Sequence, residues 1–174
     1  DDSVDRYDGT PRSLFVDSVL PAFERLVSDG RIGAWGITGI GVPPAVLETI
    51  RSNPQPAAVQ AIANLLDSPG AIKRYDEPAI PREIISAAHQ RGVSVMGIRA
   101  VQAGALTSSL DRDLPEDHPE AVDFRRAAPF RKLAAEVGES PAALAHRSAL
   151  SLDGISPVVL WVKHRGARSS DGRR

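Results

Sequence analysis

The sequence predicts an α/β fold in which parallel strands alternate with helices. Four short apolar runs have the length and composition of buried strands, at residues 32–38, 57–62, 93–98 and 157–162. Segments with apolar residues at helical spacing separate these runs. Strands that alternate with helices form a parallel sheet with right-handed crossovers. The alternation alone leaves a doubly wound sheet and a barrel both open.

The first helix is expected over residues 11–29, with Thr10 as the N-cap. Pro21 lies inside its apolar pattern and predicts a kink or two consecutive helices, because proline has no N–H to continue the helical bonding. The strand at 32–38 follows, and it ends in the segment Thr38-Gly39-Ile40-Gly41. Glycines and a small hydroxyl at the carboxyl end of a parallel strand are typical of a ligand-binding turn.

The later elements follow from the same periodicity and from proline positions. Pro129 breaks an otherwise continuous helical pattern, and Ser140-Pro141 reads as an N-cap followed by a first-position proline. The expected elements are helices over 44–51, 81–91, 121–137 and 142–150 and a long loop over 99–119.

Composition excludes several function classes. The 174 residues carry a net charge of −1, which argues against nucleic acid or an anionic membrane as the main partner. The chain has no cysteine, so disulfides, thiolate catalysis and zinc–thiolate sites are excluded. No apolar run approaches the length of a spanning helix and the first residues are acidic, so a cytoplasmic protein is expected. One domain over 1–174 is expected, with 166–174 a disordered tail, and the chain reads as a piece of a longer protein.

Four segments at the expected strand ends resemble the second half of the aldo-keto reductases. Residues 33–39 resemble the family's G-(I/V)-S-N segment, and 58–67 are similar to Q-x-x-Y-N-L-L-D. Residues 92–107 follow the pattern of an apolar strand running into Y-S-P-L-x-x-G-x-L-T, and 158–165 resemble I-P-G-x-(R/K)-N. Order and spacing match over residues 14–165.

The resemblance implies the C-terminal half of a (β/α)8 TIM barrel, strands five to eight. It implies an NADP(H)-dependent oxidoreductase, with NAD possible, that reduces an aldehyde, ketone or sugar carbonyl. The family's catalytic Asp, Tyr, Lys and His lie on the first four strands, so no catalytic residue is expected in this chain. Expected partners are the carbonyl substrate and either the missing N-terminal half or a second copy. A non-catalytic nucleotide-sensing subunit and an inactive truncated fragment remain alternatives.

The resemblance also implies contacts to the nicotinamide. Thr38 and Gly39 align with a Ser and an Asn that bind the carboxamide, although Gly39 has no side chain to offer. Gln60 aligns with a second carboxamide ligand, and Ile98 stands where many members stack a Tyr on the ring. A glycine-dependent turn for Thr38 and Gly39, and a structural hydrogen bond for Gln60, are the competing interpretations.

The phosphates have their own expected ligands. Arg99 aligns with the barrel mouth and is expected at the diphosphate, or else in a salt bridge. Val101, Gln102 and Gly104 lie on the loop expected to wrap the diphosphate through backbone amides. Lys163 and His164 align with residues at the adenosine 2′-phosphate, although a solvated basic turn also fits them.

No metal site is expected. The histidines His89, His118 and His146 have no partner at ligand spacing. The acidic residues between Asp111 and Glu120 are expected to form a solvated loop.

Overall fold

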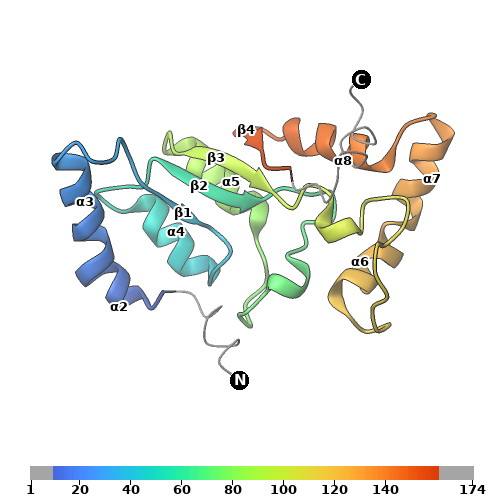
Figure 1. The fold of residues 1–174 in the computed structure, drawn as a ribbon, viewed down its shortest axis with the longest axis horizontal. Helices are drawn as coiled ribbons and strands as arrows, with labels where there is room; N and C mark the ends of the chain where they lie inside the picture. The colour runs from blue at the N-terminus through green and yellow to red at the C-terminus, as the bar shows by residue number, and fades with distance from the viewer. Residues whose placement is uncertain (1–9, 161–174) are drawn as a thin grey trace.

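A computed structural model describes residues 10–160 (Figure 1). Its strands are β1 (Gly36–Thr38), β2 (Ala58–Ile62), β3 (Ser94–Ile98) and β4 (Ile155–Val158). Its longer helices are α3 (Leu20–Ser28), α4 (Pro43–Arg51), α5 (Pro81–Gln90), α6 (Pro119–Arg126), α7 (Ala128–Glu136) and α8 (Pro141–Leu150). Short helical segments are α2 (Arg12–Leu14), the π-helix η1 (Phe15–Val19) and the 3₁₀ turns η2 (Gly70–Ile72) and η3 (Gln102–Gly104).

The four strands form one parallel sheet in the order β1-β2-β3-β4. A doubly wound sheet reverses its strand order at a switch point, whereas a barrel adds each strand beside the last. The sequential order therefore decides between the two architectures that the sequence leaves open. It is the order of half a (β/α)8 barrel.

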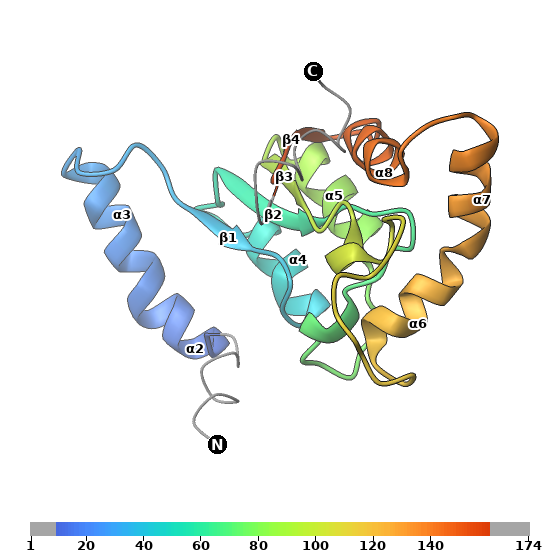
Figure 2. The same ribbon diagram turned by 45° about the vertical axis from the view of Figure 1, so that its right-hand side comes forward.

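Helices α4 and α5 cover one face of the sheet (Figures 1 and 2). Alternate strand residues point to these helices because side chains of a strand alternate between its two faces. The resulting core joins Val59, Ala61 and Val95 of the strands to Ile50 and Ile84 of the helices, all at most 4% exposed. The intervening strand residues, such as Gln60 and Met96, face the other side and are half-buried.

The N-terminal helical region confirms the irregularity expected at Pro21. The chain runs from α2 through a π-helical segment at Phe15–Val19 into α3, with Pro21 in the first turn of α3. A π turn there shifts the hydrogen-bonding register just before the residue that has no N–H to donate. Trp35 packs on this helix, with its ring stacked on Phe23 at a centroid distance of 5.9 Å.

In the C-terminal region, the helices are divided and begin where the proline positions predict. The helix expected over 121–137 is divided into α6 and α7 at Ala127, and Pro129 lies in the first turn of α7. Ser140 caps α8 by accepting a hydrogen bond from the N–H of Ala143. A second, smaller core of Leu106, Ala127 and Ala145 joins these helices to the loop after β3.

Two strands differ from their expected bounds by more than one residue. β1 begins only at Gly36, because its neighbour β2 begins at Ala58 and the preceding residues have no strand beside them. β4 begins two residues earlier than expected, at Ile155, because Gly154 turns the chain into the strand with a φ of +90°, and it ends at Val158. Residues 161–162 of the expected strand lie outside the described residues. Pro157 is compatible with this strand because it lies in the irregularity of the β3–β4 pairing between Ile155 and Val158.

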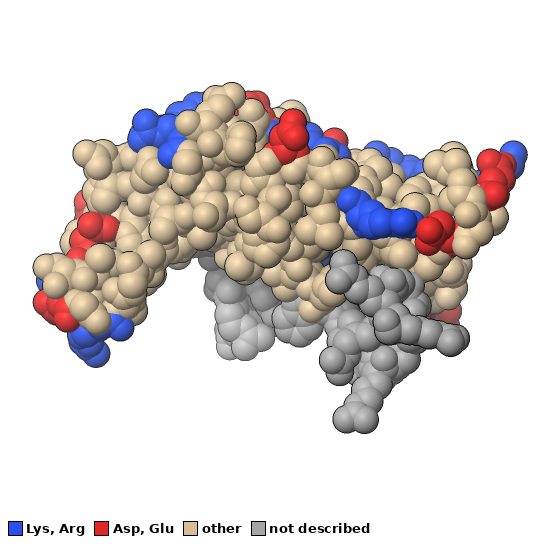
Figure 3. Space-filling model, turned by 90° about the horizontal axis from the view of Figure 1, so that it is seen from above, with Lys and Arg blue, Asp and Glu red and all other residues tan. Residues whose placement is uncertain are grey.

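Acidic and basic side chains are interspersed on the face of the molecule that Figure 3 shows. This distribution agrees with the net charge of −1. No helix between residues 10 and 160 has the length and apolar character that a bilayer crossing requires.

Candidate functional site

Three polar or polarisable side chains form one row across the sheet face opposite α4 and α5. Thr38 pairs in register with Gln60, and Gln60 pairs with Met96. The hydroxyl of Thr38 donates to Oε1 of Gln60 at 3.3 Å, and Nε2 of Gln60 donates to the sulfur of Met96 at 3.8 Å. The structure therefore brings together the two expected carboxamide ligands, Thr38 and Gln60.

The row does not saturate the amide of Gln60. A primary amide has two N–H donors and a carbonyl oxygen with two lone pairs. Within residues 10–160, one donor goes to the weakly accepting sulfur of Met96 and one lone pair goes to Thr38. One donor and one acceptor of Gln60 remain, on a half-buried side chain that a ligand can reach.

Gly39 contributes to the fold rather than to this row. Its N–H donates to the carbonyl of Gln60 at 2.7 Å, which extends the β1–β2 pairing. A Cβ at Gly39 would lie 2.9 Å from Cγ2 of Val59 and 3.3 Å from Cγ1 of Val46, on the helix-covered side. A side chain here would thus collide with the core, which is a physical reason for glycine at this position.

The other site residues expected near the carboxyl end of β3 are Ile98, Val101 and Gly104. Ile98 is half-buried and pairs in register with Ile62 of β2. Val101 packs against the small core that contains Leu106. Gly104 has a φ of +97°, and its carbonyl accepts from the hydroxyl of Thr107 at 2.7 Å. Lys163 and His164 lie outside the described residues.

Arg99 stands at the start of an unusual turn. Its φ is +59°, and Gln102 and Ala103 also have positive φ values of 48° and 49°. Non-glycine residues in this region are uncommon and persist where the surroundings hold them in place. The Arg99 side chain is held by two neighbours, with Nε donating to Oε1 of Gln102 and Nη2 donating to Oε1 of Glu120, both at 2.9 Å.

Gln102 is the centre of this arrangement and is completely buried. Its Oε1 accepts from Arg99 and, at 3.3 Å, from Nδ2 of Asn64. Its Nε2 donates to Oδ2 of Asp123 at 2.7 Å and to Oγ of Ser68 at 3.2 Å. Both ends of the amide are therefore satisfied, as burial requires.

Glu120 is the second anchor and is only 4% exposed. Burial is the largest influence on its pKa and raises it, but the N–H of Ala71 and the guanidinium of Arg99 outweigh burial and lower the pKa below its usual range. Oε2 of Glu120 lies 2.9 Å from Nδ1 of His118 and has no other partner within residues 10–160. Nδ1 of His118 accepts from the backbone N–H of Glu120 at 3.3 Å, which caps the start of α6.

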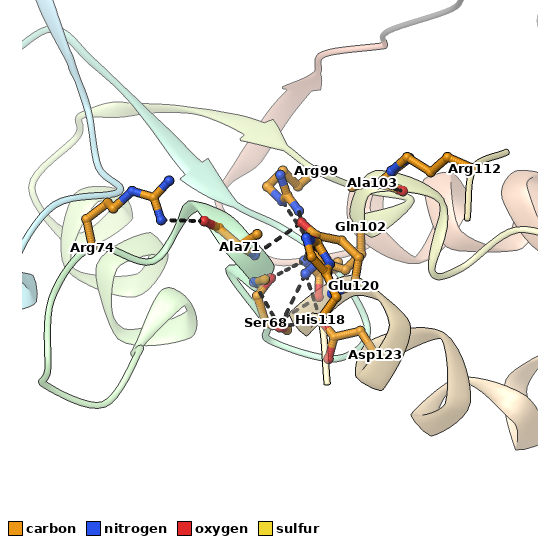
Figure 4. Close-up of polar contacts among 12 residues, drawn as sticks. Ser68, Ala71, Arg74, Arg99, Gln102, Ala103, Arg112, His118, Glu120 and Asp123 are labelled. Atoms are coloured by element: carbon orange, nitrogen blue, oxygen red, sulfur yellow. Dashed lines mark hydrogen bonds and ion pairs between the residues drawn. The ribbon is translucent and has the colours of Figure 1, made fainter. Parts of the chain in front are cut away.

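These side chains form one network at the carboxyl ends of β2 and β3 (Figure 4). It connects the loop after β2, the turn after β3 and the first turns of α6. We call it the buried polar cluster, and its members are Asn64, Ser68, Arg99, Gln102, Glu120 and Asp123.

Sequence reasoning misses most of this cluster. Glu120 is expected in a solvated acidic loop, but it is buried in the first turn of α6. The available signal is the spacing of Glu120 and Asp123, because residues three apart share one face of a helix. Gln102 is expected on the diphosphate loop, but the sequence does not indicate that its side chain is buried, since a glutamine in a loop is ordinarily solvated. The structure also brings no three His, Cys, Asp or Glu side chains together for a metal within the residues it describes.

Comparison with known proteins identifies the fold. The sequence profile of the aldo/keto reductase family matches residues 3–166. Thirty-five chains of solved structures match. One is aldo-keto reductase AKR11C1 from Bacillus halodurans in its holo form, with a TM-score of 0.60 and 22% sequence identity. No curated protein matches the sequence.

The alignment with AKR11C1 covers 90% of this chain but only 49% of the solved one, so the chain spans about half the length of that structure. The parallel sheet with sequential strand order is thus part of a TIM barrel, as the sequence predicts. The family profile covers nearly all of the residues, and the chain belongs to the aldo/keto reductase family.

Proposed function

We propose that this chain is the cofactor-binding half of an oxidoreductase. The complete barrel would transfer hydride between NADP(H) and the carbonyl group of an aldehyde, ketone or sugar. Family membership and the half-barrel fold support an oxidoreductase of this type. The observation that carries the assignment of the site is the row of Thr38, Gln60 and Met96 on the sheet face opposite α4 and α5.

The chemistry of this row fits a nicotinamide carboxamide. A carboxamide offers two donors and a carbonyl acceptor, so its ideal partner has both donor and acceptor capacity. Gln60 keeps one free N–H and one free lone pair within residues 10–160, and the hydroxyl of Thr38 can donate or accept. Binding would replace the long Thr38–Gln60 contact of 3.3 Å with shorter bonds to the ligand.

The other contacts of the cofactor would extend along the same strand ends. Ile98 is half-buried at the end of β3 and would pack on the nicotinamide ring. The turn at residues 99–104 would meet the diphosphate through its backbone, and Lys163 and His164 would favour NADP over NAD at the 2′-phosphate. Gly39 would act through its backbone, because its Cβ position is filled by the core.

In this proposal the bound nucleotide supplies the hydride, and the residues of this chain bind and orient it. The carboxamide contacts would fix the ring's rotation so that one face is presented to the substrate. The proton-transfer groups would come from the first four strands of the barrel, which would pair with the edges of β1 and β4. The substrate pocket would be completed there as well.

A titration with two ligands tests the assignment. NADPH carries the nicotinamide, whereas 2′-phospho-ADP-ribose keeps the phosphates and lacks it. Thr38→Val removes one hydroxyl at constant shape, and one hydrogen bond of about 1 kcal/mol corresponds to a five- to tenfold rise in the Kd for NADPH. The Kd for 2′-phospho-ADP-ribose should not change. Equal effects on both ligands would remove Thr38 from the nicotinamide site, and a wild-type chain that binds neither would reject the cofactor assignment.

A further inference from the structure

Side chains from other segments hold the left-handed turn after β3, at residues 99–104, in its conformation. Three of its residues, Arg99, Gln102 and Ala103, have positive φ without being glycine. Each such residue costs about 1–2 kcal/mol relative to ordinary backbone. This cost is offset only by surroundings that fix the conformation, and the buried polar cluster provides them.

The cluster ties together three segments that are far apart in sequence. Gln102 bonds to Asn64 and Ser68 from the loop after β2, and to Asp123 from α6. The turn cannot move without breaking bonds in both other segments. Figure 4 shows the side chains converging between the end of β3 and the start of α6.

Gly70 provides the space that the cluster needs. Its φ is +55°, and a Cβ there would lie 2.7 Å from Nε2 of Gln102. The same Cβ would lie 3.0 Å from Nη2 of Arg99 and from Oε1 of Glu120. A single side-chain atom at Gly70 would therefore displace three members of the cluster together.

The turn also has hydrogen-bond donors that have no partner among residues 10–160. The backbone N–H groups of Val101 and Ala103 make no hydrogen bond to residues 10–160. Val101, with a φ of −94° and ψ of 7°, is followed by Gln102 in the left-handed region. Right- and left-handed residues in succession direct neighbouring N–H groups into a concavity that attracts anions. Nη1 of Arg99 also has no hydrogen-bond partner within the described residues, and the side chain is 17% exposed.

We propose that Gln102 and Glu120 are positioning residues, which hold the 99–104 turn in the conformation that receives the cofactor diphosphate. They do not touch the ligand. Gln102 fixes the backbone of the turn through its side-chain bonds and holds Nε of Arg99, and Glu120 holds Nη2. Nη1 is then left for a phosphate oxygen. This inference rests on the proposed function and adds to it the means by which the diphosphate site is preformed.

Gln102→Met tests the proposal with the full 174-residue chain. Methionine keeps the length and volume of the side chain but makes none of the four hydrogen bonds. Because the turn holds the diphosphate, the Kd should rise about tenfold for NADPH and equally for 2′-phospho-ADP-ribose. Thr38→Val should instead affect NADPH alone, so the two sites have different ligand signatures.

Hydrogen exchange gives a readout that needs no ligand. In the Gln102→Met chain, amides of residues 99–107 and of 64–71 should exchange faster together, while those of α4 stay unchanged. Glu120→Gln should raise both Kd values in the same way, because Nη2 of Arg99 loses its charged acceptor. Glu136→Gln, on the exposed surface of α7, is its matched control and should alter neither Kd nor exchange. Wild-type affinity in a folded Gln102→Met chain would overturn the positioning role and leave the proposed function standing. A wild-type chain that binds neither ligand would overturn both.

Discussion

Replacing Gly70 by alanine should destabilise the chain far more than the same change at Gly138. Both glycines have positive φ, 55° and 69°, so alanine meets a similar backbone penalty of about 1 kcal/mol at each. That penalty is partly offset because alanine also restricts the unfolded chain, by about 0.4–1 kcal/mol. At Gly138 no heavy atom lies within 4 Å of the new methyl group, so the net change should stay below about 1 kcal/mol.

At Gly70 a second cost arises. The methyl group would lie 2.7 Å from Nε2 of Gln102, so the amide must move away from its bonds to Asp123 and Ser68. The loss of a buried hydrogen bond to a charged group costs about 1.5–3 kcal/mol. We therefore expect Gly70→Ala to lower the free energy of unfolding by about 2–3 kcal/mol more than Gly138→Ala.

Urea denaturation followed by circular dichroism measures this difference directly, and thermal melts should place the two variants about 4–10 °C apart. Because both variants carry a similar backbone penalty, the difference between their free energies of unfolding measures the collision of the new methyl group with the buried polar cluster. Equal midpoints for the two variants would refute the reasoning, because they would mean that Gly70 faces open space as Gly138 does.

Two further predictions follow from the same structure. Glu120→Gln should lower the free energy of unfolding by about 1.5–3 kcal/mol at neutral pH, since the bond from Arg99 loses its charge, whereas Glu136→Gln should change it by less than about 0.5 kcal/mol. The folded-state pKa of Glu120 lies below its ordinary value of 4.5, so its contribution is complete above that value and disappears as the pH falls through the lower folded value. Acid titration of wild-type stability should fall more steeply below pH 4.5 than that of Glu120→Gln, and parallel curves would contradict this. The isolated chain, of 18.5 kDa, should self-associate in light-scattering chromatography because β1 and β4 are sheet edges with no further strand beside them among residues 10–160. A monomer that melts sharply would speak against an incomplete barrel.

The sequence specifies the elements whose signals are local. Pro129 and Ser140 divide and start helices through the missing N–H of proline and the capping oxygen of serine, and both appear where expected. Periodicity also identifies the strands, because a buried strand is a short apolar run whatever its partners are. The bounds of β1 and β4 are less accurate, since they depend on which neighbouring residues are available to pair.

The residues of the site likewise fall into those with a signal in the sequence and those without one. Thr38 and Gln60 are found from the sequence because they align with polar residues of the family's strand motifs, and parallel register then brings them side by side. The buried polar cluster is not, because its members come from three segments and their burial depends on tertiary packing. Arg99 illustrates the limit: the sequence leaves a ligand and a salt bridge as alternatives, and in the structure its guanidinium is bonded to both Glu120 and Gln102.

The proposed function depends on the binding of a nicotinamide carboxamide by the row of Thr38, Gln60 and Met96. The side-chain amide resonances of Gln60 in a 15N-labelled chain test this binding most directly, with assignment by the Gln60→Leu variant. Addition of NADPH should shift them, because the ligand replaces the contacts to Thr38 and Met96, while 2′-phospho-ADP-ribose should bind and leave them in place. If NADPH binds and the Gln60 amide resonances do not move, the nicotinamide lies elsewhere and the central claim is wrong.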